Sequence, residues 1–565
     1  MAFFVSIFLN TLRKSVHLKK FTTMIRSISI WILASIFIYT ISYSQCEEES
    51  EQRVILIGDS WAFFMGVDQT INTVFRNWGH SDKQFYTNTT LSENGARTTD
   101  FLEADKQQEM LEVFANLPEA DHVHLSIGGN DFLGNWKMSF TEEETEELKQ
   151  EVIDQLLEII DFIRDNKPGV KIMWSGYVYT NFEEEIERFI LPTQHPFYST
   201  WQGMEFPDNE SLNLQTINFM ESVEEALAEY DDVFFINAPG LMQYHFGQTD
   251  PLQVAPFGTY QPQTAELPYG FVEYPSPRNS MRDYGITRDC FHLSGRGYRT
   301  MIGYQTQKYY HKALMNDRYY IAQGGGASGS IGSDEQVSST LFLGENNNVN
   351  NHTVVNFELT DLPDTSLQKA SLFFHQKTET GSNPFNGSVT VKMKENYFGN
   401  DVNISFSDLT DVPSAQAEVC TFGSKEEGHW VRLDLPEVFL HAIKNQSAVS
   451  FIISSDANGL VELSGTEDEE FAPVLDLTFM ESVLSTEEEI VETETIVVYP
   501  NPTKGIIQIK TPEIIKQIAV LDMQGKGIFY ANEVEFIDLT AQKKGIYIVQ
   551  IDTKQGRTFH KIVKE

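Results

Sequence analysis

Two short stretches of the chain hold residue types that together can activate a nucleophile. Ser60 ends the stretch VILIGDS at positions 54–60, and Asp289 and His292 share the stretch DCFH at 289–292. A serine hydroxyl attacks poorly until a base takes its proton, and a histidine does so near neutral pH when a carboxylate orients its ring. A spacing of three residues lets one loop present both Asp289 and His292. The chemistry that these residues predict is acyl transfer, with Ser60 as the nucleophile.

Two further turns offer donors for the negative oxygen that forms when a serine attacks a carbonyl. Asn130 lies in GGND at 128–131, and its side-chain amide is a hydrogen-bond donor. Gly95 lies in NGAR at 94–97 and offers a backbone N–H. A helix that begins after Ser60 would add free backbone donors at its N-terminus. Donors of this kind stabilise the tetrahedral intermediate of acyl transfer.

The elements that must position these groups belong to a parallel sheet wrapped by helices. Short apolar runs alternate with helical patterns from 53 to 317, which is typical of α/β domains. Ser60 and Asn130 each follow such a run, so both should lie at the carboxyl edge of the sheet, where open α/β folds bind ligands. Thr141 and Glu144 form a capping box that starts the clearest helix. The predicted strands are 53–57, 122–127, 170–174 and 233–237, and the other predicted helices are 61–75, about 214–230 and one after 295–297.

Each motif alone also fits an ordinary turn, a helix cap or a surface histidine. In combination and in this order, the four motifs resemble the sequence blocks of the SGNH (GDSL-type) hydrolase superfamily over residues 53–317. The resemblance implies a three-layer, flavodoxin-like α/β domain that needs no metal or cofactor. It also implies a triad of Ser60, His292 and Asp289, and an oxyanion hole formed by the Ser60 N–H, the Gly95 N–H and the Asn130 side chain.

Two features depart from the family pattern. Trp61 stands where the family often has Leu, which bears on packing or substrate contact. Between 177 and 288 the pattern loosens into a long stretch rich in aromatic residues and proline, and long irregular segments in compact domains are often functional. We predict that these aromatic residues supply a stacking surface at the cleft, with Trp61, Trp201 and Tyr244 as substrate contacts.

The rest of the chain predicts a multidomain protein. Its predicted parts are a signal peptide at 1–45, the hydrolase domain at 50–320, a Gly/Ser-rich linker at 321–334, a β-sandwich at 335–480, an acidic linker at 481–495 and a small β-sandwich-like unit at 496–565. The sandwich prediction rests on alternation of apolar and polar residues in 355–359, 389–393 and 475–479. The linker prediction rests on the glycines at 324–326 and 332.

Both β-rich parts resemble known modules. Stretches such as VRLDL at 431–435 and FAPVL at 471–475 resemble DNRLRE-type carbohydrate-binding modules, although a purely structural sandwich fits the same patterns. Trp430 and Tyr397 are candidates for stacking on sugar rings, and Trp430 fits a buried position better. VYPNP at 498–502 and KIVK at 561–564 resemble the type IX secretion C-terminal sorting domain of Bacteroidota. That resemblance implies export by the type IX secretion machinery to the medium or the cell surface.

The N-terminal residues predict export as well. Arg26 precedes an apolar run at 28–43, and small or polar residues follow, which is the order of a secretory signal cleaved near Ser44. Met24 is an alternative start. The run has 16 residues, short for a spanning helix of about 20, so we expect no membrane-spanning segment in the mature protein.

Charge and cysteine content limit the function classes. The 565 residues include 41 basic and 81 acidic side chains, for a net charge of -40. Such a chain repels phosphates, so we expect no nucleic-acid partner. Three cysteines, Cys46, Cys290 and Cys420, are too few for a disulfide framework, and the sequence assigns no bridge.

The company of domains suggests a carbohydrate esterase that removes acetyl or other acyl groups from polysaccharide. A lipase or general carboxylesterase acting on other ester substrates is the alternative. A non-catalytic glycan-binding surface protein is a third interpretation, and the complete set of site residues argues against it.

Overall fold

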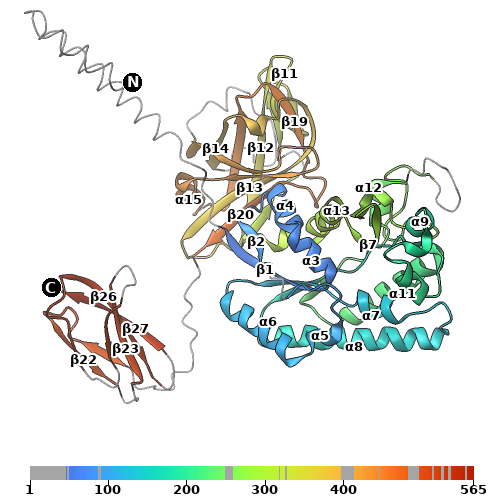
Figure 1. Ribbon diagram of the computed structural model, residues 1–565. Coiled ribbons are helices and arrows are strands. Elements are labelled where there is room, and N and C mark those ends of the chain that lie inside the picture. Colours follow the sequence, from blue (N-terminus) through green and yellow to red (C-terminus); the bar gives the residue numbers. More distant parts are fainter. Residues whose placement is uncertain are drawn as a thin grey trace, which may run out of the picture. The chain divides into compact units, whose positions relative to one another are not determined.

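The computed structural model describes most of the chain in two compact units, Met1–Met480 and Glu481–Glu565 (Figure 1). The described residues are 46, 50–86, 91–248, 259–316, 318–324, 327–395, 413–444, 446–480, 496–511, 515–522, 527–531, 536–553 and 557–565. The predicted signal peptide, the acidic linker and Tyr397 lie outside these residues. The first unit holds an α/β domain and a β-sandwich, and the second holds the small C-terminal β-rich part.

A five-stranded parallel sheet forms the middle layer of the α/β domain. The strand order is β2-β1-β3-β4-β5, which is the flavodoxin-like order. The predicted three-layer fold is confirmed. The strands are β1 (Glu51–Gly58), β2 (Lys83–Tyr86), β3 (His122–Ser126), β4 (Lys171–Trp174) and β5 (Val233–Phe235). The sequence prediction missed β2, whose four residues KQFY form too short and too mixed a pattern.

Alternate side chains of β1 pack in two separate cores, because successive side chains of a strand point to opposite faces. Ile55 and Ile57 pack in the core beneath α6 (Ala104–Asn116), α8 (Glu142–Asn166) and α11 (Asn209–Leu227). Val54 and Leu56 pack in the core beneath α3 (Ser60–Val67), α4 (Thr70–Asn77) and α13 (Gly295–Gln305). Figure 1 shows these two helix groups on opposite sides of the sheet.

Local signals explain where the helices begin and end. The predicted capping box of Thr141 and Glu144 is present at the start of α8. The single helix predicted at 61–75 is instead the pair α3 and α4, because Gln69 adopts a positive φ of 50° between them. α3 itself begins at Ser60, directly after β1.

The β-sandwich begins earlier than the sequence indicates. β8 (Arg318–Ile321) follows α14 (His311–Ala313) almost at once and pairs with β20 (Val474–Phe479). β9 (Gly329–Gly332) pairs with β12 (Val349–Glu358) inside the stretch predicted as linker. A Cβ on Gly329 would lie 2.3 Å from the carbonyl oxygen of Ser338. Close strand contact, rather than flexibility, therefore accounts for this glycine.

One long strand joins the two sheets of the sandwich. β13 (Leu367–Gly381) pairs with β17 (Trp430–Asp434) and β20 along its first part, and with β19 (Gly459–Leu463) after a register shift between Gln376 and Thr378. A single apolar cluster fills the space between the sheets. The remaining strands are β10 (Val337–Ser338), β11 (Leu341–Asn346), β14 (Val389–Glu395), β15 (Ala415–Glu418), β16 (Cys420–Gly423) and β18 (Ala448–Ser455).

The sandwich completes the core of the α/β domain on its α4 side. Trp430 of β17 is 1% exposed, and its ring centroid lies 3.9 Å from that of His311. Phe373 and Trp430 belong to the same buried cluster as Val54 and Leu56 of β1. Arg432 donates to the carbonyl oxygen of Gly79 at 2.8 Å. Trp430 is therefore unavailable for stacking on a sugar ring, because its faces are used inside the protein.

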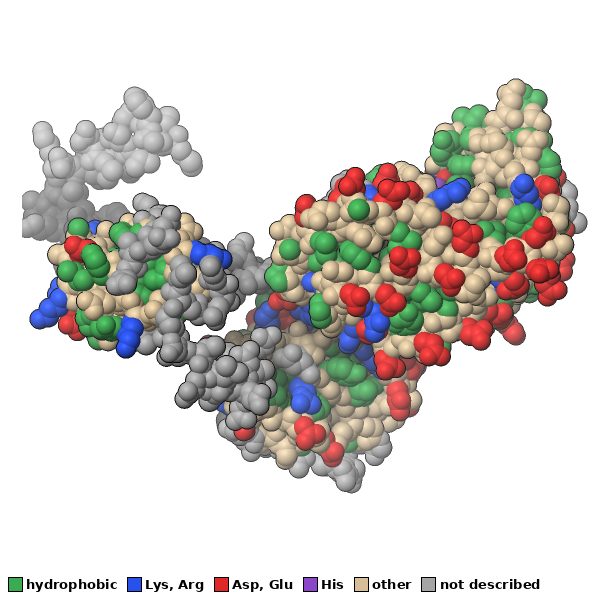
Figure 2. Space-filling view, turned by 90° about the horizontal axis from the view of Figure 1, so that it is seen from below, with side chains coloured by type: hydrophobic (Ala, Val, Ile, Leu, Met, Phe, Trp, Pro, Cys, Tyr) green, Lys and Arg blue, Asp and Glu red, His purple; other side chains and the backbone are tan. Residues whose placement is uncertain are grey.

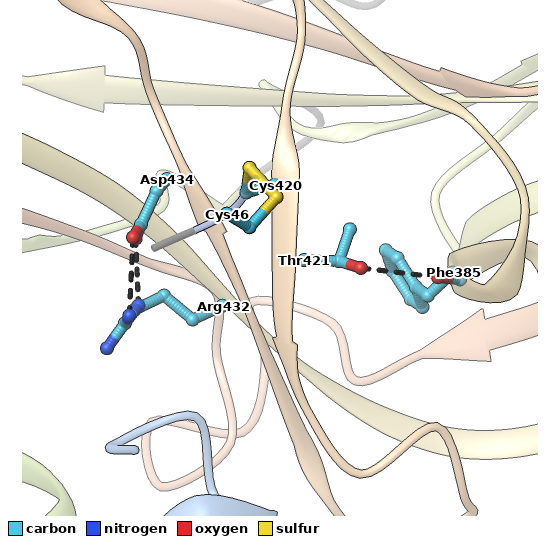
Figure 3. The surroundings of a disulfide bond; sticks show 6 residues. All are labelled: Cys46, Phe385, Cys420, Thr421, Arg432 and Asp434. Atoms are coloured by element: carbon cyan, nitrogen blue, oxygen red, sulfur yellow. Dashed lines mark hydrogen bonds and ion pairs between the residues drawn. A yellow bond between two sulfur atoms is a disulfide. The ribbon is translucent and has the colours of Figure 1, made fainter. Parts of the chain in front are cut away.

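A disulfide ties the start of the described chain to the sandwich (Figure 3). Cys46 and Cys420 are bonded across 374 residues, beside the ion pair of Arg432 and Asp434. Cys290 is buried and unbridged. The sequence could count the cysteines but could not pair them, since two of them meet only after the sandwich has formed.

The second unit is a small β-rich domain with its own apolar core. It contains a three-stranded sheet in the order β21-β22-β25 and a four-stranded sheet in the order β24-β23-β26-β27. The strands are β21 (Val497–Tyr499), β22 (Ile506–Lys510), β23 (Gln517–Asp522), β24 (Gly527–Ala531), β25 (Phe536–Asp538), β26 (Gly545–Asp552) and β27 (Arg557–Lys564).

On the face seen in Figure 2, acidic side chains are spread over the first unit rather than gathered in one patch. In the described part of the chain, we find no helix with the length and apolar character needed to cross a bilayer.

Candidate active site

Ser60 lies at the carboxyl end of β1, between the ends of β1 and β3, where the strand order changes direction. Such switch points are where flavodoxin-like sheets bind ligands. Gly58 permits the tight turn, because a Cβ there would lie 1.9 Å from the carbonyl oxygen of Ser126 in β3. Asp59 then caps α3 by accepting a hydrogen bond from the Trp61 N–H at 2.9 Å. The turn places Ser60 at the first position of α3.

The structure brings Ser60, His292 and Asp289 together in one chain of hydrogen bonds. Nε2 of His292 lies 2.7 Å from Oγ of Ser60, and Nδ1 of His292 lies 2.8 Å from Oδ2 of Asp289. Oδ1 of Asp289 accepts the backbone N–H groups of Phe291 and His292, both at 2.9 Å. These bonds fix the carboxylate within β7 (Thr287–Leu293). The arrangement can transfer a proton from the serine to the imidazole while the carboxylate holds the ring.

Two of the three residues predicted to supply oxyanion donors line the same cavity. Ser60 and Asn130 both line it, and Asn130 stands near the start of α7 (Gly129–Asn135), directly after β3. The Asn130 amide donates one hydrogen to the carbonyl oxygen of Ala96 at 2.9 Å and has a second hydrogen to offer. Gly95 lies in the adjacent turn at a φ of 80°, is exposed, and does not line the cavity.

A buried carboxylate that the sequence motifs did not single out joins the two donor turns. Asp131 is 5% exposed and accepts from the Thr98 hydroxyl at 2.8 Å and from the Thr98 N–H at 3.1 Å. Burial raises the pKa of Asp131 above its ordinary value. Its position in GGND, five residues after the end of β3, was the only signal in the sequence. Asp131 thereby holds the NGAR turn against the start of α7.

The cavity beside Ser60 is small and mainly apolar. Its volume is about 40 Å³. Trp61 lines it and is held edge-on by Tyr177, with ring centroids 5.1 Å apart, and its contact with substrate stays a prediction. The other apolar or aromatic lining residues are Phe132, Leu133, Tyr177, Val178, Phe219, Met220 and Phe291.

Trp201 and Tyr244 do not join this cavity, so their prediction as substrate contacts is corrected. Trp201 is 8% exposed and packs in the core, where its indole N–H donates to the carbonyl oxygen of Pro207 at 2.9 Å. Tyr244 lies on α12 (Leu241–Phe246), next to the His245 ring and away from the cavity lining. The aromatic content of residues 177–288 indicates many large side chains, but it does not indicate which of them fill the core. Within the described residues, no cluster of three or more His, Cys, Asp or Glu side chains is arranged to hold a metal.

Several solved structures resemble the chain at low sequence identity. A lipase from a goat rumen metagenome is 11% identical, with 46% of this chain and 98% of that chain covered and a TM-score of 0.28. A GDSL-like lipase from Bacteroides thetaiotaomicron is 14% identical, with 49% and 97% covered and a TM-score of 0.25. A gut microbial diltiazem-metabolizing enzyme is 12% identical, with 57% and 59% covered and a TM-score of 0.30. A comparison with curated proteins gives no match.

Two family models match the chain. Residues 56–300 match the GDSL-like lipase/acylhydrolase family, and residues 497–565 match the secretion system C-terminal sorting domain. Neither match includes the β-sandwich, so its likeness to carbohydrate-binding modules stays a prediction. The chain thus carries a GDSL-like acylhydrolase domain, which acts on ester bonds, and a C-terminal sorting domain that directs it to the medium or the cell surface.

Proposed function

We propose that the protein is a secreted carbohydrate esterase that removes acetyl or similarly short acyl groups from polysaccharide. Ser60 is the nucleophile, His292 the general base and acid, and Asp289 the residue that orients His292. The hydrogen-bonded chain from Ser60 Oγ through His292 to Asp289 is the observation that carries the mechanism.

The reaction proceeds in two acyl transfers. Ser60 Oγ attacks the ester carbonyl while Nε2 of His292 takes its proton, and the bond to the sugar oxygen breaks as His292 returns that proton to the leaving alcohol. Water then attacks the acyl-enzyme by the same route and releases the carboxylic acid. The Ser60 N–H and the Asn130 amide stabilise the negative oxygen in both steps.

The size of the cavity supports a short acyl group. A volume of about 40 Å³ beside Ser60 leaves room for only a few water-sized positions, at about 10 to 15 Å³ each. An acetyl group, with its carbonyl and one methyl group, is of that size. The apolar lining suits the methyl group, while a long acyl chain would need the aromatic side chains to move.

The domain arrangement supports a polymeric substrate. The sorting domain places the enzyme outside the cell, where polysaccharides are accessible, and an acidic surface disfavours anionic membranes. The sandwich covers the α4 side of the hydrolase domain and leaves the Ser60 cavity on the carboxyl edge of the sheet.

Acetate release from acetylated polysaccharides tests the proposal. We expect the full-length protein to release acetate, and to hydrolyse p-nitrophenyl acetate with a higher kcat/KM than p-nitrophenyl decanoate. Ser60→Ala should abolish both activities. Turnover by Ser60→Ala at the wild-type rate would contradict the mechanism, and failure of a fluorophosphonate to label Ser60 would favour a non-catalytic glycan-binding protein.

A lipase or general carboxylesterase is the alternative, because the matching family includes lipases by its description. That alternative predicts the opposite order of chain lengths, with the decanoate ester preferred and little acetate released from polysaccharide.

A further inference from the structure

A buried carboxylate next to the nucleophile takes no part in the proton transfer just described. Asp59 is 1% exposed, although it lines the cavity together with its neighbour Ser60. Oδ1 of Asp59 accepts the Trp61 N–H at 2.9 Å, and Oδ2 accepts the hydroxyl of Tyr177 at 2.7 Å. Burial raises the pKa of Asp59 to about 7. A carboxylate kept in such surroundings needs both hydrogen bonds, because a buried charge without partners is costly.

The hydroxyl of Tyr177 also reaches the turn that carries Asn130. Its oxygen accepts the Gly129 N–H at 2.9 Å while its hydrogen is donated to Asp59. Burial raises the pKa of Tyr177 well above its ordinary value, so the phenol keeps the proton that it donates. One oxygen atom therefore connects the start of α3 to the start of α7.

The ring of Tyr177 is held as firmly as its hydroxyl. Its centroid lies 5.1 Å from that of Trp61 and 6.4 Å from that of Trp174, both in edge-on contact. At position 129, a Cβ would lie 2.7 Å from Cζ of Tyr177, so glycine is required for the phenol to approach the backbone. Tyr177 reaches this place from the loop that follows β4, which is independent of both turns.

We propose that Tyr177 is a positioning residue, whose hydroxyl fixes the distance between the nucleophile turn and the oxyanion turn so that the Ser60 N–H and the Asn130 amide converge on one oxygen. The inference rests on the proposed roles of Ser60 and Asn130. Tyr177 does not exchange a proton with the substrate. Its effect is geometric, and small displacements of catalytic groups are expensive in rate because the donors must match the transition state.

The test compares Tyr177→Phe with Tyr179→Phe in the full-length protein. Tyr179 lies two residues further along the same loop and donates its own hydroxyl to the carbonyl oxygen of Tyr269 at 2.7 Å. Both variants keep the ring, but Tyr177→Phe loses two hydrogen bonds and Tyr179→Phe loses one, so both should be less stable than wild type, Tyr177→Phe the more so. We expect kcat for p-nitrophenyl acetate to fall about 10- to 100-fold in Tyr177→Phe, with KM within about twofold, and to stay within about twofold of wild type in Tyr179→Phe.

Two more measurements separate positioning from a general loss of packing. A boronic acid that forms a tetrahedral adduct on Ser60 should bind Tyr177→Phe more weakly by about the factor lost in kcat, because it uses the same oxyanion donors. Asp59→Asn changes the acceptor of the Tyr177 hydroxyl, and it tests the same contact if Tyr177→Phe does not fold. In the double variant of Tyr177→Phe and Asp59→Asn, the second substitution should lower kcat little beyond the loss that the first one causes.

The outcomes are distinct from those that test the proposed function. If Ser60→Ala is inactive but Tyr177→Phe keeps kcat and boronic acid affinity within about twofold of wild type, the positioning role is wrong and the esterase proposal stands. Additive losses in the double variant also overturn it. If Ser60→Ala remains active, the proposed function fails first.

Discussion

The side-chain amide of Asn130 donates a hydrogen bond to the carbonyl oxygen of Ala96, 2.9 Å away, and so joins the turn after β3 to the turn that holds Gly95. One amide hydrogen is thereby used for structure, and the other is oriented by it. Together with the bonds from Thr98 to Asp131, this contact makes the two turns a single rigid rim beside Ser60.

Removal of the Asn130 amide should reduce catalysis far more than binding. We expect Asn130→Ala to lower kcat by about 10²- to 10³-fold, the usual effect of losing one oxyanion donor, with a smaller change in KM. The matched control is Asn135→Ala on the same helix, since Asn135 also donates to a backbone carbonyl, that of Asp131, at 2.8 Å but does not line the cavity. Equal losses in both variants would mean that Asn130 acts only on the fold of α7.

The volume of the acyl cavity should be set in part by Met220. Met220 is 1% exposed and lines the cavity from α11. Met220→Ala should raise the ratio of kcat/KM for p-nitrophenyl butyrate over acetate by about 10-fold or more, since one methylene in an apolar pocket is worth about 10- to 200-fold. Met242→Ala loses a fully buried methionine elsewhere in the core and should leave the ratio unchanged. An unchanged ratio in Met220→Ala would place the acyl group elsewhere.

The bond between Cys46 and Cys420 should be detectable by thiol counting. In denaturant without reductant, iodoacetamide should label one cysteine, Cys290, and after reduction it should label three. Cys46→Ser with Cys420→Ser should lower the free energy of unfolding by about 2 to 5 kcal/mol, because the unfolded chain regains the freedom that the bond removes. Three labelled thiols before reduction would contradict the pairing.

Asp476 should make the stability of the first unit depend on pH. It is 4% exposed, accepts hydrogen bonds from the backbone and side chain of Asn316, and burial raises its pKa to about 7. The folded protein therefore binds this proton more tightly than the unfolded chain, and stability from this group falls as pH rises from about 4 to 7. Asp476→Asn stays neutral, so its unfolding free energy relative to wild type should increase over that range. A difference in unfolding free energy that stays constant from about pH 4 to 7 would show that folding does not raise the pKa of Asp476.

The sequence predicted the site residues whose type is fixed by the chemistry they perform. It missed residues, such as Tyr177, that matter only through their position in the fold. Ser60, His292, Asp289 and Asn130 could be found because few side chains perform their functions, and because Ser60 and Asn130 each follow a recognisable strand pattern. Asp289 and His292 were expected on a loop, whereas they lie in β7. Tyr177 carries no such constraint, since a tyrosine in a loop fits many environments. Its link to Gly129 exists only once β1, β3 and β4 lie side by side.

The other differences between the sequence predictions and the structure arise from contacts between segments that are apart in the sequence. Trp201 and Trp430 were candidates for stacking because tryptophan is common at such surfaces, yet both fill cores made by segments far apart in the sequence. Local periodicity located several sandwich strands but not β8, which has four residues, or β9, which has glycine at both ends and resembles a linker. β8 is defined by its pairing with β20, more than a hundred residues away, and β9 by its pairing with β12, 19 to 25 residues further along the chain.

The shared core beneath α4 has a consequence for how the chain becomes a working enzyme. A nascent chain that stops near residue 317 would leave the apolar face around Tyr310 and Leu314 bare, because Phe373, Trp430 and Val474 have yet to be synthesised. Maturation of the catalytic half must wait for the last strand of its neighbour. Attempts to trim the enzyme to a minimal catalytic fragment should therefore yield aggregates, whereas grafts that move both halves as one cassette should stay soluble.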